Sequence, residues 1–545
     1  MHPSRPPASR VAGNSIALYS VNAALVGAAF LFSQSCSPSA AASPMDVEAA
    51  ARAPAVPGPA AQEPRSAAAN TATASAPAAA KPVPGEGILH LGSNQPRVDP
   101  MVAMADAPFF PSRASTGGSV VTHDMFTKAE SCKECHTEIY QQWSESIMGH
   151  SWRDPIYRAL LKLASNATNK AVDRFCIGCH TPIGLLTGTA DAIKGDNAGF
   201  ECADVDCESC HTMSSSSGAG NGSYVITPVV AGRPVKFGPR DDAFSPFHDT
   251  VKSDLHTKSE MCAVCHNVTH PFNRLPVERT YDEWRDSPYS SAGVSCQDCH
   301  MVKEPGVTAN PGRSAPDGKE RPHIFAHTFA GANVTLHEVF ESNKGAELAR
   351  KMLQSAATIE IVDKPAVLAA GQTAAIRIKV TNVGAGHKLP TGFPEGREMW
   401  VDFKVADADG KEIYRLGRID GGHTEHGTHS FKATLGDAKG NVVEHEVWLA
   451  DRVLSDTRIL PKGWQMADYT FEVPNGVRGP LQLVADLNYW SFPQAVLDGL
   501  LGKGEVASKV ILMAQLKCEI PLAAKVASSG TAEPRQSAEP ERGNR

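Results

Sequence analysis

Five copies of the sequence Cys-x-x-Cys-His lie between residues 132 and 300, and they constrain the fold of this chain more than any other feature. In this pattern, two thiols three residues apart can form thioethers with the two vinyl groups of one porphyrin. The histidine that follows is then placed to bind the iron as its proximal ligand. The five copies therefore predict five covalently bound c-type haems, around which this part of the chain has to fold.

We call these copies pentads 1 to 5. The predicted attachment cysteines are Cys132 and Cys135, Cys176 and Cys179, Cys207 and Cys210, Cys262 and Cys265, and Cys296 and Cys299; the predicted proximal ligands are His136, His180, His211, His266 and His300. Structural zinc is the alternative, because Cys-x-x-Cys pairs also build tetrahedral zinc sites. Zinc would not require a histidine after all five pairs, so haem is the better interpretation.

The N-terminal segment indicates export. A weakly basic start with Arg5 and Arg10 is followed by an apolar run from Ile16 to Phe32, which is typical of a secretory signal. We expect residues 1–36 to be a signal peptide and the protein to lie in the periplasm or on the outer surface of a bacterial cell envelope. Cys36 ends a poor version of the lipoprotein cleavage box, so a membrane tether through lipidated Cys36 and ordinary signal cleavage both stay open.

The rest of the chain divides by composition. Of the 40 residues from Ala41 to Ala80, 24 are Ala or Pro, so residues 37–120 are predicted to form a disordered linker. Residues 121–355 hold all the pentads in a polar sequence with few periodic runs, which predicts a mostly irregular haem domain with short helices, for example over 138–146 and 336–355. Residues 521–545 are polar and are predicted to be a disordered tail.

Residues 356–520 change to a period of two. Apolar and polar residues alternate over 376–381, 401–405 and 469–473, and turn sequences such as Asp409-Gly410 separate these runs. Such a pattern predicts antiparallel strands with one buried face. The predicted fold class is therefore a multidomain chain, in which the haem domain is followed by an all-β, immunoglobulin-like sandwich.

Words around the pentads resemble the cytochrome c-552/c-554 type of multihaem cytochrome. The first is the run from Cys132 to Tyr157, and the second is Thr280-Tyr-Asp-Glu-Trp-Arg-Asp-Ser-Pro-Tyr289 leading into pentad 5. Two further words, His327-Thr-Phe-Ala-Gly331 and Gly386-His387-Lys-Leu-Pro390, are similar as well. The resemblance implies closely spaced haems that transfer electrons outside the cytoplasm. Cys202 departs from the family's usual approach to pentad 3.

Distal ligands decide what each iron can do, because an iron with two histidines has no vacant position. Our first candidates are His123, which lies nine residues before Cys132, His327, His387, and His248, which the family pattern favours over His256. The fifth position stays open among His150, Met148, His256, His270, His323 and His337, although core packing is the better interpretation of Met148. His423, His426, His429 and His445 are expected to be solvated loop residues.

Three functional classes fit these patterns. The first is an exported electron-transfer relay, the second a multihaem reductase or oxidase that acts on a small nitrogen or sulfur compound at one open haem, and the third a structural subunit of an extracellular electron conduit. All five pentads end in histidine, so we expect an electron carrier rather than an enzyme. Its partners would be redox proteins. The net charge of −7 and the lack of a long basic tract argue against nucleic acid as a partner.

Two cysteines remain outside the pentads and the signal. Cys202 and Cys518 either form a disulfide or stay unpaired.

The haem content can be measured directly. Intact mass of the mature chain, expressed with a working attachment system, should show five bound haems and loss of the signal. Replacing Cys299 by Ala should weaken or remove one attachment and leave four. A wild-type chain with fewer than five haems would contradict the prediction.

Overall fold

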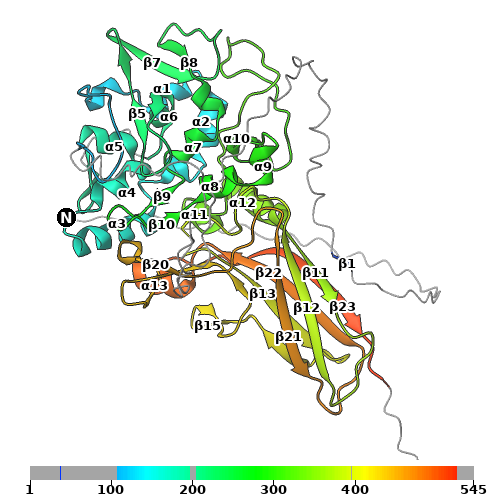
Figure 1. Ribbon diagram of the computed structural model, residues 1–545. Helices are drawn as coiled ribbons and strands as arrows, with labels where there is room; N and C mark the ends of the chain where they lie inside the picture. The colour runs from blue at the N-terminus through cyan, green and yellow to red at the C-terminus, as the bar shows by residue number, and fades with distance from the viewer. Residues whose placement is uncertain (1–36, 39–106, 197–203, 394–395, 524–545) are drawn as a thin grey trace, which may run out of the picture. The chain divides into compact units, whose positions relative to one another are not determined.

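The computed structural model describes residues 37–38, 107–196, 204–393 and 396–523 (Figure 1). The predicted signal peptide with Cys36, most of the predicted linker, Cys202 and nearly all of the predicted tail lie outside these ranges. The linker prediction over 37–120 was wrong at its end. Arg113 is buried and donates hydrogen bonds to the carbonyls of Ser217 and Ala219, and Ser115 bridges to Val225, so residues 111–115 pack onto the haem region.

Short helices carry pentads 2, 3 and 5 whole and the first cysteine of pentads 1 and 4. The helices of the haem region are α1 (Ala129–Lys133), α2 (Thr137–Ser144), α3 (Pro155–Ala167), α4 (Asp173–His180), α5 (Pro182–Thr187), α6 (Cys207–His211), α7 (Glu260–Ala263), α8 (Thr280–Arg285), α9 (Pro288–Ser291), α10 (Cys296–His300), α11 (Val334–Val339) and α12 (Asn343–Ala356). Residues three apart lie on one helix face, so a helical pentad points both thiols to the same side. Capping boxes at Asp206 and Ser295 start α6 and α10 directly before the first cysteine of pentads 3 and 5.

The haem region also contains small sheets that the sequence did not predict. Two-stranded sheets form from β2 (Ala190–Asp191) and β3 (Gly195–Asp196), from β4 (Met213–Ser216) and β5 (Tyr224–Ile226), and from β9 (Val268–Thr269) and β10 (Pro276–Glu278). A three-stranded sheet joins β6 (Val229–Val230), β7 (Arg233–Gly238) and β8 (Asp249–Lys252). These strands are too short to show a period in the sequence. Strands β7 and β8 are parallel and run beside α6 (Figure 1).

The C-terminal region is rich in antiparallel strands, as predicted. One sheet has the order β1 (Ser37–Pro38), β23 (Ile511–Ile520), β22 (Leu481–Trp490), β13 (Glu398–Ala406) and β14 (Glu412–Leu416), with β17 (Ser430–Phe431) also pairing with β13. The other sheet has the order β11 (Ala357–Asp363), β12 (Thr373–Asn382) and β21 (Trp464–Glu472). Buried side chains of both sheets form one hydrophobic core, which includes Ile378, Phe403 and Tyr469. The immunoglobulin-like connectivity stays a prediction.

The other elements of this region are β15 (Ile419–Asp420), β16 (His423–Thr424), β18 (Ala433–Gly436), β19 (Val442–Val443), β20 (Arg452–Asp456) and the helix α13 (Gln494–Leu501). Of these, β18, β19 and β20 share a hydrophobic cluster with Val268 and Val277 of the haem region. The all-β prediction missed α13. Leu497 of this helix packs with Ile156 of α3 and Leu336 of α11 in one buried cluster, so α13 joins the two regions. Within the described part of the chain, no helix is long and apolar enough to span a membrane.

Candidate haem-binding site

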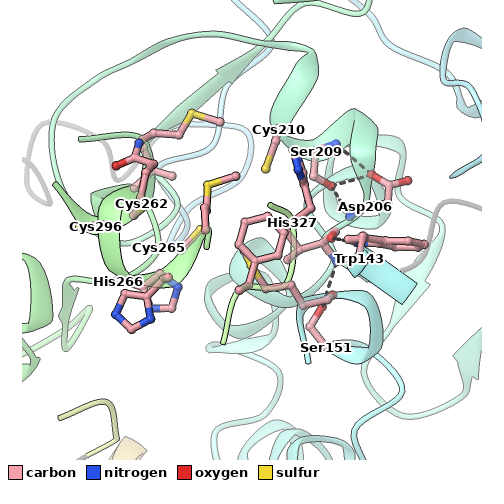
Figure 2. A pocket seen from close by; sticks show the side chains of 18 of the residues that line it. Trp143, Ser151, Asp206, Ser209, Cys210, Cys262, Cys265, His266, Cys296 and His327 are labelled. Atoms are coloured by element: carbon pink, nitrogen blue, oxygen red, sulfur yellow. Dashed lines mark hydrogen bonds between the residues drawn. The ribbon is translucent and has the colours of Figure 1, made fainter. Parts of the chain in front are cut away.

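A cavity of about 1870 Å³ runs through the haem region, and the histidines of all five pentads line it. Cysteines of every pentad line the same cavity. Figure 2 shows one part of it, where Cys210, Cys262, Cys265 and Cys296 gather and His327 lies across from them. A single cavity shared by all pentads is a space in which several porphyrins would lie close together.

Four pentad histidines are held in the same way. The Nδ1 atom of each donates a hydrogen bond to a backbone carbonyl: His136 to Ser314 at 2.7 Å, His180 to Ser151 at 3.0 Å, His211 to Phe237 at 2.8 Å and His300 to Ala330 at 2.6 Å. A metal-binding histidine characteristically donates its second ring N–H to such an acceptor, which fixes the tautomer and the ring orientation. Nε2 is then the nitrogen left for iron.

Burial keeps these imidazoles in the form that binds a metal. It lowers the pKa of His180 and of His300 to about 4, and it also lowers the pKa of His211. These rings are therefore neutral at pH 7, and neutral imidazole is the ligand for a metal ion.

The thiols connect the pentads to one another. Cys132 of pentad 1 lies beside Cys207 of pentad 3, and Cys179 of pentad 2 lies beside Cys265 of pentad 4, close enough for each pair to interact. Cys262 of pentad 4 lies beside Cys296 of pentad 5 in the same way. Cys210 of pentad 3 also lies close enough to both cysteines of pentad 4 to influence their charge. Pentad 4 thus contacts pentads 2, 3 and 5, and pentad 1 reaches it through pentad 3.

Two of the first distal candidates face pentad histidines at the spacing of a shared metal. The ring centres of His211 and His327 lie 6.3 Å apart with ring planes at 28°, and those of His300 and His387 lie 6.3 Å apart with ring planes at 15°. Two imidazole nitrogens that share one metal at bond lengths of roughly 2 Å place their ring centres about 6 Å apart. The spacing of both pairs fits an iron between them.

His248 is the third distal candidate that fits. Its Nδ1 donates to the carbonyl of Asp249 at 3.2 Å, as the Nδ1 atoms of His327 and His387 donate to Phe325 and Lys388 at 3.1 and 2.9 Å. His248 lines the cavity, and it lies close enough to His136 for the two charges to interact. This arrangement favours His248 as the partner of pentad 1.

The other candidates are placed differently. His256 lines the cavity and its ring centre lies 5.5 Å from that of His211. Its Nε2 donates to the carbonyl of Cys210 at 3.1 Å, however, so the nitrogen that the other rings present to the cavity is engaged. His150 packs its ring against Phe340, with centres 4.2 Å apart. His123 lies in a short 3-10 helix, His123–Met125. Among the described residues that line the cavity, neither His123 nor His150 occurs, whereas His445, which we expected in a solvated loop, does.

Pentad 4 differs from the other four. The Nδ1 atom of His266 faces a carboxylate, Glu278 Oε1, at 3.6 Å instead of a carbonyl. Burial lowers the pKa of His266, but the contact with Glu278 outweighs it, so the pKa is raised. Glu278 ends β10 and is buried, and it accepts a hydrogen bond from the Thr280 hydroxyl at 3.1 Å.

A buried network of charges holds the His387 loop against the haem region. Glu283 of α8 pairs with Arg458 at 2.9 Å, Arg458 pairs with Asp456 at 2.9 Å, and Asp456 pairs with Lys388 at 2.7 Å. All four side chains are at most 8% exposed. Glu283 also accepts hydrogen bonds from the Lys388 backbone N–H and the Thr391 hydroxyl. The network therefore fixes the residues on either side of the His387 ring.

These features define a c-type cytochrome site that can hold several haems. Residues 131–212, which contain pentads 1 to 3, match the family model described as cytochrome c554 and c-prime. Over residues 131–212 the chain is therefore similar to a multihaem c-type cytochrome family, as the sequence predicted. Similarity to this family indicates covalently bound haem iron and electron transfer.

Comparison with solved structures gives weaker likenesses. A penta-heme cytochrome c552 from Thermochromatium tepidum is 18% identical over 73% of this chain and 99% of its own, with a TM-score of 0.49. The CARDB domain of the PF1109 protein from Pyrococcus furiosus is 12% identical over 31% of this chain and 87% of its own, with a TM-score of 0.15. No curated protein matches this chain significantly.

Several residues of the site were missed by sequence reasoning. The carbonyls that anchor the pentad histidines carry no sequence signal, because any residue can supply them. The residues of the buried network, Glu283, Lys388, Asp456 and Arg458, are spread over 176 residues of the chain. The only sequence signal for this network was that Lys388 follows His387 in the family-like segment. Glu278 lies twelve residues after His266 and could not be placed without the fold of β9 and β10.

The network makes a prediction about stability. Arg458→Met would leave Glu283 without its buried cation, and breaking a buried ion pair costs about 3–5 kcal/mol. Urea unfolding followed by circular dichroism should show a loss of that size. Arg377→Met is the matched control, because Arg377 pairs with Asp468 on the surface with 51% and 61% of the side chains exposed, and such pairs contribute about 0–1 kcal/mol. Equal losses in both variants would contradict the prediction.

Proposed function

We propose that this chain is an exported electron-transfer protein in which all five pentads hold a haem and the five form one connected relay. The observation that carries the proposal is the shared placement of the histidines. Pentad and distal histidines are anchored through Nδ1, and two pairs stand at the 6.3 Å spacing that a shared iron requires. Haem iron, when bound there, supplies one-electron exchange between its ferric and ferrous states.

The chain's own residues suit a relay better than a reaction centre at pentads 1, 3 and 5. His327 and His387 occupy the side of the cavity opposite His211 and His300, and a second histidine excludes small molecules from an iron. His248 supports the same role opposite His136. At these three pentads the protein therefore binds and orients the cofactor and leaves no position for a substrate.

The contacts between thiols support a continuous path. Pentad 1 contacts pentad 3 through Cys132 and Cys207, and pentad 3 approaches pentad 4 through Cys210. Pentad 4 contacts pentads 2 and 5. Because attachment points in contact hold their porphyrin edges close together, this order gives a line from pentad 1 to pentad 4 with two branches.

Export and partners belong to the same proposal. The apolar segment from Ile16 to Phe32 supports secretion, which covalent attachment of c-type haem requires, and Cys36 would tether the protein if it is lipidated. Redox proteins of the cell envelope would be the donor and acceptor.

Ligation across the two regions can be tested at His387. His387→Ala should convert one low-spin haem to high-spin in the electron paramagnetic resonance spectrum, because one iron loses its second histidine. Circular dichroism should show that the strands stay folded. His429→Ala is the control, since His429 lies in the same region but donates to the carbonyl of Asp468. An unchanged spin state in the His387 variant would refute the assignment.

Carbon monoxide separates the relay from a reductase. If all five irons have two protein ligands, the reduced protein should bind little carbon monoxide, and nitrite or hydroxylamine should not turn over at an enzyme's usual rate of about 1 per second or more. Rapid binding at one haem together with turnover would favour the reductase, with the active haem at pentad 2 or 4.

A further inference from the structure

The proximal histidines differ in one respect that bears on their redox properties. Those of pentads 1, 2, 3 and 5 donate to neutral backbone carbonyls, whereas that of pentad 4 faces the carboxylate of Glu278. Glu278 is 6% exposed, so little water screens its charge. The neighbouring cation Arg279 is engaged with Asp282.

A carboxylate behind a ligating histidine changes the iron that the histidine binds. Its negative charge lies 3.6 Å from the ring Nδ1 and stabilises the ring N–H, which raises the basicity of the ligand. Its negative charge also favours the ferric state over the ferrous state, and hydrogen bonding around an axial ligand is one of the means by which a protein sets a haem potential. Both effects move the potential downward.

We propose that Glu278 acts through His266 as a positioning residue and gives the haem at pentad 4 the most negative reduction potential of the five. This inference rests on the proposed relay, because it assumes that all five pentads hold haem. Pentad 4 contacts pentads 2, 3 and 5 through its cysteines. The least reducible centre would then stand at the junction, where it separates the pool of electrons on pentads 1 and 3 from those on pentads 2 and 5.

The test is a reductive titration of the full protein, followed by optical and electron paramagnetic resonance spectra, on wild type and Glu278→Gln. Glutamine keeps the shape and removes the charge. The reduction potential of the most negative of the five components should rise by at least about 59 mV. For a one-electron couple, this is a tenfold change in the ratio of reduced to oxidised haem. The potentials of the other four components should stay unchanged. A Glu278→Gln protein with five haems and no shifted component would overturn the proposal.

Two further variants sharpen the result. Glu260→Gln removes an exposed carboxylate close to the same pentad in sequence. Glu260 accepts from the Tyr281 hydroxyl at 3.3 Å, so this change should leave all five components in place. An equal shift in this control would overturn the specific role of Glu278.

Thr280→Val removes the hydroxyl that donates to Glu278 Oε1. More of the negative charge of Glu278 should then act on His266, and the reduction potential of the same component should become more negative. The Thr280 variant tests the proposal even if Glu278→Gln fails to fold. In that case, an unchanged potential of the most negative component would reject the proposal.

Measuring the number of bound haems by intact mass distinguishes a failure of this inference from a failure of the proposed relay. A wild-type protein with fewer than five haems would refute the relay itself. Five haems with a titration that is insensitive to both Glu278→Gln and Thr280→Val would refute only the role of Glu278.

Discussion

The hydrogen bond from a pentad histidine to a backbone carbonyl is the interaction on which the haem region depends. Each of these bonds joins a short helix to a segment elsewhere in the chain; His136, for example, bonds to Ser314, which is 178 residues away. A helix such as α10, of five residues, is too short to be stable by itself. The bonds therefore do two things at once: they close the fold around the cavity, and they turn Nε2 of each ring toward the place where iron would bind.

The second constraint is that the strand-rich region supplies a ligand to the haem region. His387 stands on the loop after β12, and its partner His300 ends α10. Such a pair is useful only if the two regions dock in one way. The buried network around Glu283 and Arg458 provides this specificity, since burying charges is costly unless every partner is in place. The apolar cluster that includes Leu497 of α13 adds hydrophobic contacts, which tolerate more variation in geometry than buried ion pairs do.

Prediction from the sequence succeeded where a residue pattern and a physical requirement coincide. Pentads 1 to 3 and the period-two strands were of this kind: the family match covers the former, and the strand-rich C-terminal region agrees with the latter. It failed where structure depends on contacts between distant segments. Arg113 looked like part of a linker until the carbonyls of Ser217 and Ala219 were seen to bind it. Helix α13 is short and interrupts a run of strands, so its period could not be separated from the surrounding pattern.

The choice between His248 and His256 shows what geometry adds to a motif. Both histidines precede pentad 4, and spacing alone cannot separate them. In the structure, His248 donates through Nδ1 and His256 through Nε2, so only the first follows the rule that the pentad histidines obey. His248 also lies near His136, whose pentad is far from it in sequence. A histidine can thus act as a distal ligand when the backbone engages its Nδ1 and leaves Nε2 for the metal. Its distance from a pentad along the chain says little about which haem it binds.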